Sequence, residues 1–302
     1  MTRFLPVLLF LASQSFSQPE NLKMVREKTE TRLREVVQNV QGAFGFVAFD
    51  LVRGERFGIN ENLLFPQGSA IKIPILMEMF KQAQEGKIKL TDMLWVEKKK
   101  QVGGSGILVE FGDKTSQLSV RDLCVLMIVL SDNTATNMLI DLVGMEGINK
   151  TLASLGLKQT RVQRRMLDQA ASVRGDENLS TPAEAARIME ILHKGEFINR
   201  STCDDIFSIL KKPKPEIGAI QSGVPGDVPV AFKPGDIAGV NTEWAIIYLP
   251  NLPYVLTVME NYGVGDEATA AMKECSRVLY EYFSRVSKAT RYGTYVPHLL
   301  IK

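Results

Sequence analysis

The sequence predicts a mixed α/β fold of the α+β kind, in which an antiparallel sheet built from both chain ends adjoins an all-helical lobe. Short β-rich runs occur near the N-terminus and again after residue 211, and the segment between them is mostly helical in pattern. A chain of 302 residues can bury a large core, and its 45% hydrophobic content is ordinary for a globular protein. We expect one domain over residues 18–302, with the sheet lobe at about 18–62 and 212–290 and the helical lobe at about 63–211.

The first residues have the pattern of a secretory signal peptide. Arg3 is followed by an apolar run from Phe4 to Ala12, and Ser15 and Ser17 have the spacing that signal peptidase prefers. The run is too short to cross a bilayer, and a buried N-terminal helix is the alternative interpretation. No cysteine follows the run to carry a lipid. We therefore expect residues 1–17 to be removed and the rest to be periplasmic or secreted, without a stable membrane anchor.

The elements of the N-terminal part follow from hydrophobic spacing. Between residues 20 and 40, apolar side chains recur at helical spacing at Leu22, Val25, Leu33, Val36 and Val37. The stretch from Gly42 to Asn60 then reads as two strands joined by a turn near Arg53 and Gly54.

The helical signals run from about residue 69 to residue 210. A helix is predicted to begin after a Ser119 cap, and because residues 123–130 are apolar on nearly every side, it belongs in the middle of the lobe. A later helix has Thr181 as its cap, Pro182 in its first turn and Glu184 placed to close a capping box.

The pattern returns to strands after Lys211. The runs DVPVAFK, TEWAIIYLP and YVLTVMEN are β-rich and are separated by Gly, Pro and Asn. A last helix is predicted over residues 267–283. Its apolar side contains Ala271, Cys275, Val278, Leu279 and Tyr282.

Charge and rare residues exclude several classes of function. The net charge of +2, without a basic run longer than residues 98–100, does not favour a nucleic-acid partner. The two histidines have no motif around them, so we expect neither a Ser-His-Asp triad nor a metal or other cofactor. The three cysteines are too widely spaced for a disulfide framework; Cys124 reads as a small buried hydrophobe, and a bridge between Cys203 and Cys275 stays open.

Three short motifs occur in order along the chain. They are Ser69-Ala70-Ile71-Lys72, Ser131-Asp132-Asn133 and Lys233-Pro234-Gly235. Each has an ordinary structural interpretation alone: a helix start with a surface lysine, a helix C-cap and turn, and a strand exit. The pair in SILK, residues 208–211, has the same spacing as Ser69 and Lys72 but lacks the two later motifs, so we expect it to be structural.

The ordered set resembles the class A β-lactamase and penicillin-binding-protein superfamily, whose signature is S-x-x-K, S-D-N and K-T-G. The resemblance covers essentially the whole chain after the signal segment, and it includes the separations between motifs and the GDENLSTP segment after the omega loop.

The resemblance implies a role for each motif residue. Ser69 is the nucleophile, and Lys72, which shares its helix face, is the base that takes its proton. Ser131 relays a proton to the leaving nitrogen, and the N–H groups of Ser69 and Asp236 bind the oxyanion. The residues expected to hold the substrate are Asn133, Lys233, Gly235 and Asp236. Residues Gly103 to Leu108 lie where relatives place a flexible rim beside the substrate, and a plain connection between helices is the alternative.

The omega loop, residues 161–178, departs from the family pattern. Relatives carry a glutamate there that activates the deacylating water, but Arg164 aligns Met166 with that position. Glu177 lies in a turn, where a structural role is expected. Asp168 is the only carboxylate placed to substitute as a catalytic base, although a salt bridge with Arg164 or Arg165 is the preferred interpretation.

The part of the site that binds a substrate carboxylate also departs from the family pattern. Pro234 replaces the threonine or serine whose hydroxyl grips that group in relatives, and Asn241 aligns with an arginine that many relatives supply. Lys233 then binds the anion with little help.

We therefore expect a serine hydrolase that opens β-lactams or related acyl substrates through a Ser69 acyl-enzyme, with slow deacylation. An esterase, a cell-wall peptidase and a non-catalytic penicillin-binding sensor are the alternatives. The expected partner is the small-molecule substrate alone, and the expected state is a monomer.

Overall fold

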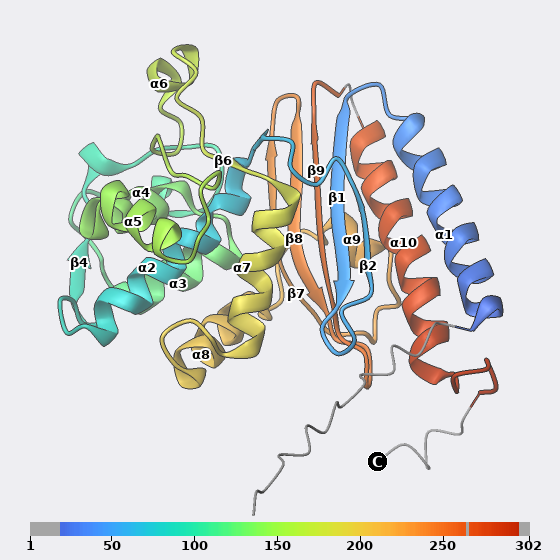
Figure 1. Ribbon diagram of the computed structural model, residues 1–302. Coiled ribbons are helices and arrows are strands. Elements are labelled where there is room, and N and C mark those ends of the chain that lie inside the picture. The colour runs from blue at the N-terminus through green and yellow to red at the C-terminus, as the bar shows by residue number, and fades with distance from the viewer. Residues whose placement is uncertain (1–18, 264–265, 296–302) are drawn as a thin grey trace, which may run out of the picture.

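The computed structural model describes residues 19–263 and 266–295. The expected signal peptide, residues 1–17, lies outside the described residues. The described residues form a sheet with helices on both faces, and the helical lobe lies on one of these faces (Figure 1).

The main sheet contains strands from both ends of the chain, as predicted. From the N-terminal part come β1 (Ala43–Asp50) and β2 (Arg56–Ile59), and from the C-terminal part β7 (Val230–Ile237), β8 (Val240–Ile247) and β9 (Tyr254–Asn261). Their order is β2-β1-β9-β8-β7, with every neighbouring pair antiparallel. The predicted α+β class is therefore confirmed, and β7 is an edge strand.

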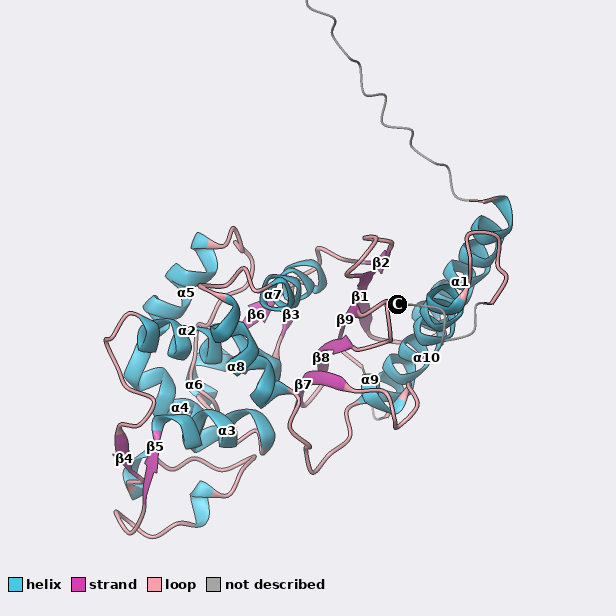
Figure 2. Ribbon diagram, turned by 90° about the horizontal axis from the view of Figure 1, so that it is seen from below, coloured by secondary structure: helices cyan, strands magenta, loops and turns pink. Residues whose placement is uncertain are grey.

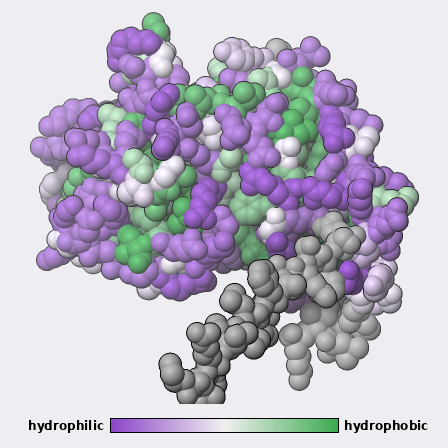
Figure 3. Space-filling view, viewed as in Figure 1, coloured by the Kyte–Doolittle hydropathy of each residue, from purple (hydrophilic) through white to green (hydrophobic). Residues whose placement is uncertain are grey.

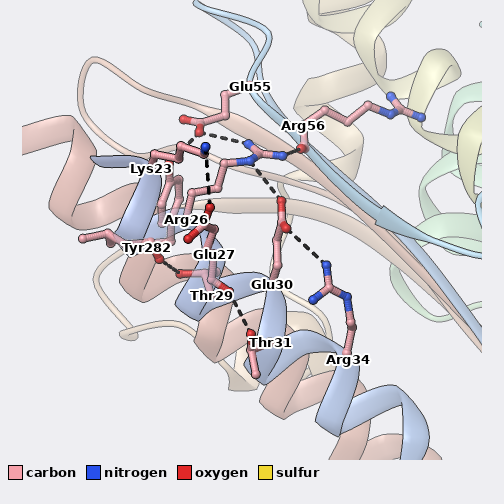
Figure 4. A network of polar contacts seen from close by, with 11 residues as sticks. Lys23, Arg26, Glu27, Thr29, Glu30, Thr31, Arg34, Glu55, Arg56 and Tyr282 are labelled. Carbon is pink, nitrogen blue, oxygen red and sulfur yellow. Dashed lines mark hydrogen bonds and ion pairs between the residues drawn. The ribbon is translucent and has the colours of Figure 1, made fainter. Parts of the chain in front are cut away.

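One face of this sheet is covered by the two terminal helices. The helices are α1 (Glu20–Gln38) and α10 (Glu267–Lys288), with the short α9 (Ala219–Ser222) beside them. Figure 4 shows how α1 is held in place: Arg26 contacts Glu30 on its own helix and Glu55 before β2, and Glu55 accepts a hydrogen bond from Tyr282 of α10. A cluster of buried apolar side chains fills this layer.

The helical lobe packs on the other face, and Figure 2 shows it on the opposite side of the sheet from α1 and α10. It contains α2 (Lys72–Gln84), α3 (Val120–Val129), α4 (Asn133–Val143), α5 (Met145–Ser154), α6 (Gln169–Val173), α7 (Pro182–Lys194) and α8 (Arg200–Leu210). Every residue of α2 from Lys72 to Phe80 is buried, so this helix is the centre of the lobe. A second apolar cluster joins the lobe to the sheet.

Short elements complete the chain. Within the described part they are β3 (Phe65–Pro66) paired with β6 (Leu179–Ser180), β4 (Met93–Trp95) paired with β5 (Gln117–Ser119), and the 3₁₀ turns η1 (Gly68–Ile71), η2 (Lys98–Lys100) and η3 (Leu108–Glu110). The helix α6 projects from the surface in Figures 1 and 3.

The two predicted helix caps have different outcomes. Ser119 forms a complete capping box with Asp122, as its position suggests. Thr181 does accept from the backbone N–H of Glu184, but the Glu184 carboxylate does not return to the cap. It accepts instead from the N–H groups of residues 158–160 and from the hydroxyl of Thr160, so the prediction of a closed box was wrong. Several donors from a distant segment therefore hold the Glu184 carboxylate in place of the single backbone N–H at its own helix cap.

All three cysteines are buried free thiols, and no disulfide joins Cys203 to Cys275. Cys124 lies in the core of the helical lobe, as predicted, and burial raises the pKa of its thiol to about 12.

Over the described residues, the structure contains no helix with both the length and the apolar character needed to cross a bilayer.

Candidate active site

Ser69 lies where the sheet meets the helical lobe, in the turn η1 that leads directly into α2. The preceding Gly68 has a φ of 48°, in the left-handed region that glycine tolerates best. A Cβ built on Gly68 would lie 3.2 Å from the backbone nitrogen of Asp236, so η1 and the edge strand β7 approach each other closely here. This turn and this strand edge bring the first and third sequence motifs together.

The register of β7 decides what it presents to Ser69. Just beyond the ladder, the Tyr248 N–H donates to the carbonyl of Pro229. Because hydrogen bonding to β8 alternates along β7, the backbone nitrogens of Pro234 and Asp236 point away from β8. Pro234 therefore costs the sheet no hydrogen bond, as expected for proline on an edge strand. The Asp236 N–H faces η1, where the resemblance places an oxyanion donor. The third motif lies inside β7 rather than at its end, because the strand continues to Ile237.

Lys72 places its amine at the centre of the site. Its Nζ lies 2.9 Å from Ser69 Oγ, 3.0 Å from Ser131 Oγ and 3.0 Å from Asn133 Oδ1, and it also donates to the Ser131 carbonyl at 2.7 Å. The side chain has no exposed surface. Burial and then the charge of Lys233 lower the pKa of the Lys72 amine well below its ordinary value, and Asp132 opposes them. A lysine in this state can accept a proton from a hydroxyl.

Ser131 connects the two lysines of the site. Its hydroxyl is 3.0 Å from Lys72 Nζ and 3.1 Å from Lys233 Nζ. The backbone of Ser131 has a φ of 53°, which is uncommon for a residue other than glycine. Asp132 stabilises this turn, because its buried carboxylate caps α4 at Ala135 and accepts from the N–H groups of Ile107 and Leu108. The second motif is thus the connection between α3 and α4, and it is tied to the rim loop.

Hydrogen bonds to both polar atoms of its side-chain amide hold Asn133 in position. Its oxygen accepts from Lys72, and its Nδ2 donates to the carbonyl of Gly103 at 2.9 Å. The Asn133 backbone N–H also donates to Ser105. The segment from Gly103 to Leu108, predicted as a flexible rim, is therefore attached to the second motif and contributes Gly104 and Ser105 to the site.

Lys233 is the second buried cationic side chain that contacts Ser131. Besides Ser131 Oγ, its Nζ contacts the Pro234 carbonyl at 2.8 Å. Burial and the nearby Lys214 lower the pKa of the Lys233 amine to about 7, while Glu243 and Glu216 act in the opposite direction. Asn241, which aligns with the arginine of many relatives, faces Asp236 across the hairpin and donates to Glu260 at 3.5 Å.

A cavity of about 240 Å³ opens beside Ser69. Its lining residues are Gly68, Ser69, Gly104, Ser105, Asn133, Arg164, Met166, Leu167, Asn178, Asp236 and Ile237. Met166 is held there by Asn137, which accepts from the Met166 N–H at 2.8 Å and donates to its carbonyl at 3.1 Å. The position that carries the glutamate in relatives is therefore a methionine at the edge of the cavity, which is 7% exposed and packs with the apolar core of the helical lobe.

The carboxylates of the omega loop have structural partners. Arg164 pairs with Glu177 at 2.8 Å, which confirms the structural interpretation of Glu177. Arg165 pairs with Asp141, so the predicted pairing of Asp168 with either arginine was wrong. Asp168 caps α6 by accepting from Ala171 at 3.0 Å, and it is absent from the cavity lining.

The control pair at Ser208 and Lys211 has the structural role expected of it. Ser208 is exposed and donates to the Asp205 carbonyl, and Lys211 lies over the ring of Tyr248 at 4.0 Å. A larger cavity of about 720 Å³ lies at the ends of α1 and α10, and no residue of the three motifs lines it.

Several polar residues near the site carry no motif and were missed. Asn137, Lys214 and Glu243 are examples, since each acts through a tertiary contact with no local pattern. The one available signal was composition, because Glu243 directly precedes the apolar run from Trp244 to Ile247.

Comparison with known proteins gives a consistent result. A sequence model described as the Beta-lactamase enzyme family matches residues 28–283. An imipenem-hydrolyzing β-lactamase of Enterobacter cloacae is 26% identical over 276 residues, covering 89% of this chain and 92% of that protein. β-Lactamase AST-1 of Nocardia asteroides is 31% identical over 185 residues, which are 58% of this chain and 60% of that protein.

Solved structures agree in fold across most of the chain. The structure of PBP-A is 25% identical with a TM-score of 0.78, covering 85% of this chain and 96% of that one. A β-lactamase from Sphaerobacter thermophilus DSM 20745 is 27% identical, with a TM-score of 0.78 and coverage of 85% and 97%. With the family match spanning residues 28–283 and the three motifs meeting at one site, the chain belongs to the β-lactamase enzyme family and is a class A β-lactamase-like serine hydrolase.

Proposed function

We propose that the protein opens β-lactam amide bonds by forming an ester with Ser69. The observation that carries this proposal is the 2.9 Å contact between Ser69 Oγ and the buried amine of Lys72. Lys72 takes the Ser69 proton while Oγ attacks the carbonyl carbon, and the N–H groups of Ser69 and Asp236 stabilise the oxyanion. The carbon–nitrogen bond then breaks, and the proton passes from Lys72 through Ser131 to the leaving nitrogen.

The substrate is held by groups around this reaction centre. The Asn133 amide positions the acyl side and Lys233 attracts an anionic group. Gly235 has an indirect role, because the absence of a Cβ lets β7 approach the turn that carries Ser69. Because Pro234 offers no hydroxyl, Lys233 is the main anchor for a carboxylate, and each lost charge-assisted hydrogen bond costs about 1.5–3 kcal/mol of binding. We infer that penicillins with a carboxylate bind more weakly here than in relatives with a K-T-G motif.

Deacylation is the slow step in this proposal. The ester is hydrolysed when water attacks its carbonyl, and that water needs a base. Met166 cannot accept a proton, and the Asp168 carboxylate is engaged as a helix cap. A point mutant of PBP-A is described as an acyl-enzyme complex with penicillin-G, and it aligns with 86% of this chain at a TM-score of 0.79. We propose that Asp168 is structural and that this chain retains its acyl group.

We also propose that the protein acts outside the cytoplasm as a monomer, after cleavage at Ser17. The pattern of residues 1–17 supports export, and the β-lactam target class is consistent with it.

The test uses the chain without residues 1–17 and an excess of a chromogenic cephalosporin. We expect a burst of about one product per protein, followed by slow turnover, and an intact-mass adduct that maps to the Ser69 peptide. Sustained rapid turnover would contradict slow deacylation. If neither burst nor adduct formed while a linear ester was hydrolysed, the esterase alternative would replace the β-lactam proposal.

A further inference from the structure

Leu167 is an exposed apolar residue of the omega loop that has no part in the proposed reaction. It is 49% exposed, and it lines the cavity beside Ser69. Its backbone has a φ of 60°, in the left-handed region that favours glycine and asparagine. A leucine in this conformation requires an explanation, because strained backbone of this kind gathers at functional sites.

Hydrogen bonds on both sides of Leu167 hold its backbone in this conformation. Asn137 accepts from the N–H of Met166 and donates to the Met166 carbonyl. The N–H of Asp168 donates to the Arg165 carbonyl at 3.4 Å and closes a four-residue turn. Leu167 is the third residue of this turn, at the position where a type II turn requires a positive φ. The turn therefore presents the leucine side chain at a defined place.

The side chain of Leu167 meets the rim loop at Gly104. A Cβ built on Gly104 would lie 3.3 Å from Leu167 Cδ1, 3.6 Å from Leu167 Cδ2 and 2.9 Å from Asn133 Nδ2. The leucine thus occupies the space that a side chain at position 104 would need. The omega loop and the rim are in apolar contact immediately beside Asn133.

The rim side of this contact is also fixed. Asn133 donates from its Nδ2 to the Gly103 carbonyl at 2.9 Å and from its backbone N–H to the Ser105 carbonyl at 3.0 Å. The Asp132 carboxylate accepts from the N–H of Ile107 at 2.7 Å. Separating Leu167 from Gly104 therefore requires a change in the leucine side chain or the loss of hydrogen bonds in one of the two loops.

This contact lies where the acyl side of a substrate would extend. In the proposed reaction the acyl group is on Ser69 and its amide is held by Asn133, so its side chain continues toward Gly104 and Leu167. The cavity has a volume of about 240 Å³. Pockets for small molecules are typically about 300–1,000 Å³. A large acyl side chain therefore has no room while Leu167 is in place.

We propose that Leu167 is a specificity-determining residue that limits the size of the acyl side chain, so that the site takes acyl donors with small side chains. A small alkyl group fits beside Asn133, whereas a large aryl group must first displace Leu167 from Gly104. The left-handed turn keeps the leucine in this place although its backbone is strained. This inference rests on the proposed function and names the substrate class of the same site.

The experiment uses two penicillins with the same bicyclic core, one with an acetyl and one with a biphenylcarbonyl side chain. Because the core and its carboxylate are shared, the ratio of the two acylation rates reports on the acyl side alone. The rates come from rapid-quench intact mass of the Ser69 adduct. Leu167→Gly removes both the side chain and the strain, and Leu167→Ala removes most of the side chain but leaves a Cβ on the left-handed backbone.

Ile198→Gly is the matched control. Ile198 has a φ of 63° and is 46% exposed, so it resembles Leu167 in conformation and exposure. It lies in the connection between α7 and α8 and is absent from the cavity lining. The control therefore relieves the same kind of strain at a place where no acyl group is expected.

The unmodified chain should be acylated faster by the acetyl penicillin than by the biphenylcarbonyl penicillin. In both Leu167 variants the biphenylcarbonyl rate should rise relative to the acetyl rate by at least about tenfold, the scale on which a pocket discriminates by size. The ratio should stay within about twofold in Ile198→Gly. Leu167→Gly should melt about 2 °C higher than Leu167→Ala, because only glycine adopts the left-handed backbone without strain.

The outcomes separate the two proposals. An unchanged ratio in the Leu167 variants would overturn the inference alone. Slower acylation by the biphenylcarbonyl penicillin would do so too, because it would mean that the leucine binds large side chains. An equal rise in Ile198→Gly would point to general loosening and would also overturn it, and a higher melting temperature for Leu167→Ala would contradict the strain. Absence of any adduct from both penicillins in the unmodified chain would overturn the proposed function.

Discussion

At the scale of single residues, the chemistry depends on one serine out of two with the same local pattern. Ser69 contacts a buried amine and lines a cavity, whereas Ser208 is exposed and its lysine lies over an aromatic ring. Ser69→Ala should abolish covalent adduct formation with the chromogenic cephalosporin, because no hydroxyl remains to attack. Ser208→Ala should retain at least about half of the acylation rate. Equal loss in both variants would remove the basis of the site assignment.

Met166 is the residue that we expect to limit turnover. Asn137 fixes its backbone through two hydrogen bonds, so a replacement side chain should point toward the same cavity. Met166→Glu adds a carboxylate that can activate water, and general-base catalysis contributes about 10²–10⁴-fold. We expect steady-state hydrolysis to rise at least tenfold with the burst unchanged.

The control for this prediction is Met166→Gln, which has a similar shape and no base. An equal rise with glutamine would show that access of water, rather than proton transfer, limits deacylation.

The motif residues could be predicted because each is tied to a fixed local spacing. Ser69 and Lys72 share one turn, and Ser131 and Asn133 share another. The partners of these residues could not be predicted in the same way. Asn137 meets Met166, and Asp132 meets the rim at Ile107, only after segments far apart in sequence have folded together, and no periodic pattern marks such contacts.

At the scale of elements, the site is the contact between the turn η1 and the edge strand β7. A Cβ on Gly235 would lie 2.7 Å from the Ala70 nitrogen and would overlap the Gln67 carbonyl. Gly235→Ala should therefore push β7 away from η1 and displace Lys233 and the oxyanion donor on Asp236. A displacement near 1 Å costs about 10²-fold in rate, so we expect a loss of that order in acylation.

Gly226→Ala is the matched control, because a Cβ there meets no atom within 4 Å. We expect it to acylate normally. Normal acylation in Gly235→Ala, measured with the same cephalosporin, would mean that the close approach of strand and turn is not required.

Element boundaries followed the sequence less closely than element types. The strand β7 runs through the third motif to Ile237, although a Lys-Pro-Gly sequence is typical of a strand exit. The edge position explains the difference, since the N–H that proline lacks would face away from β8. In the same way, Glu184 leaves its own helix cap for the chain at residues 158–160, where several backbone donors converge.

At the scale of the whole molecule, the two lobes could be predicted because strand patterns occur at both ends of a helical segment. The order β2-β1-β9-β8-β7 could not, because pairing partners far apart in sequence leave no local trace. The contact between the two lobes could not be predicted from the sequence either. It depends on Gln67, a side chain with no exposed surface that lies just before Ser69.

Gln67 connects the sheet, the omega loop and the catalytic turn. Its side-chain oxygen accepts from Trp244 Nε1 at 2.9 Å, and its amide nitrogen donates to the Phe65 carbonyl at 2.8 Å. The Gln67 backbone donates to Asn178 and accepts from the hydroxyl of Thr242. One residue therefore fixes how the sheet lobe and the helical lobe meet at the site.

Gln67→Leu should destabilise the whole molecule while leaving every motif residue in place. Leucine fills a similar volume but leaves the buried Trp244 N–H without its partner and removes the amide hydrogen bond to the Phe65 carbonyl. An unsatisfied buried group costs about 1–3 kcal/mol, and a lost hydrogen bond costs about 1 kcal/mol. We expect the free energy of unfolding in urea to fall by about 2–4 kcal/mol. Acylation should fall too, because the residue before Gly68 and Ser69 loses its side-chain hydrogen bond to Trp244 of β8 and keeps only the backbone contact to Thr242. The exposed Gln169→Leu serves as the control and should change stability by less than about 0.5 kcal/mol. Equal stabilities for the two variants would mean that apolar packing alone, without this buried amide, holds the lobes together.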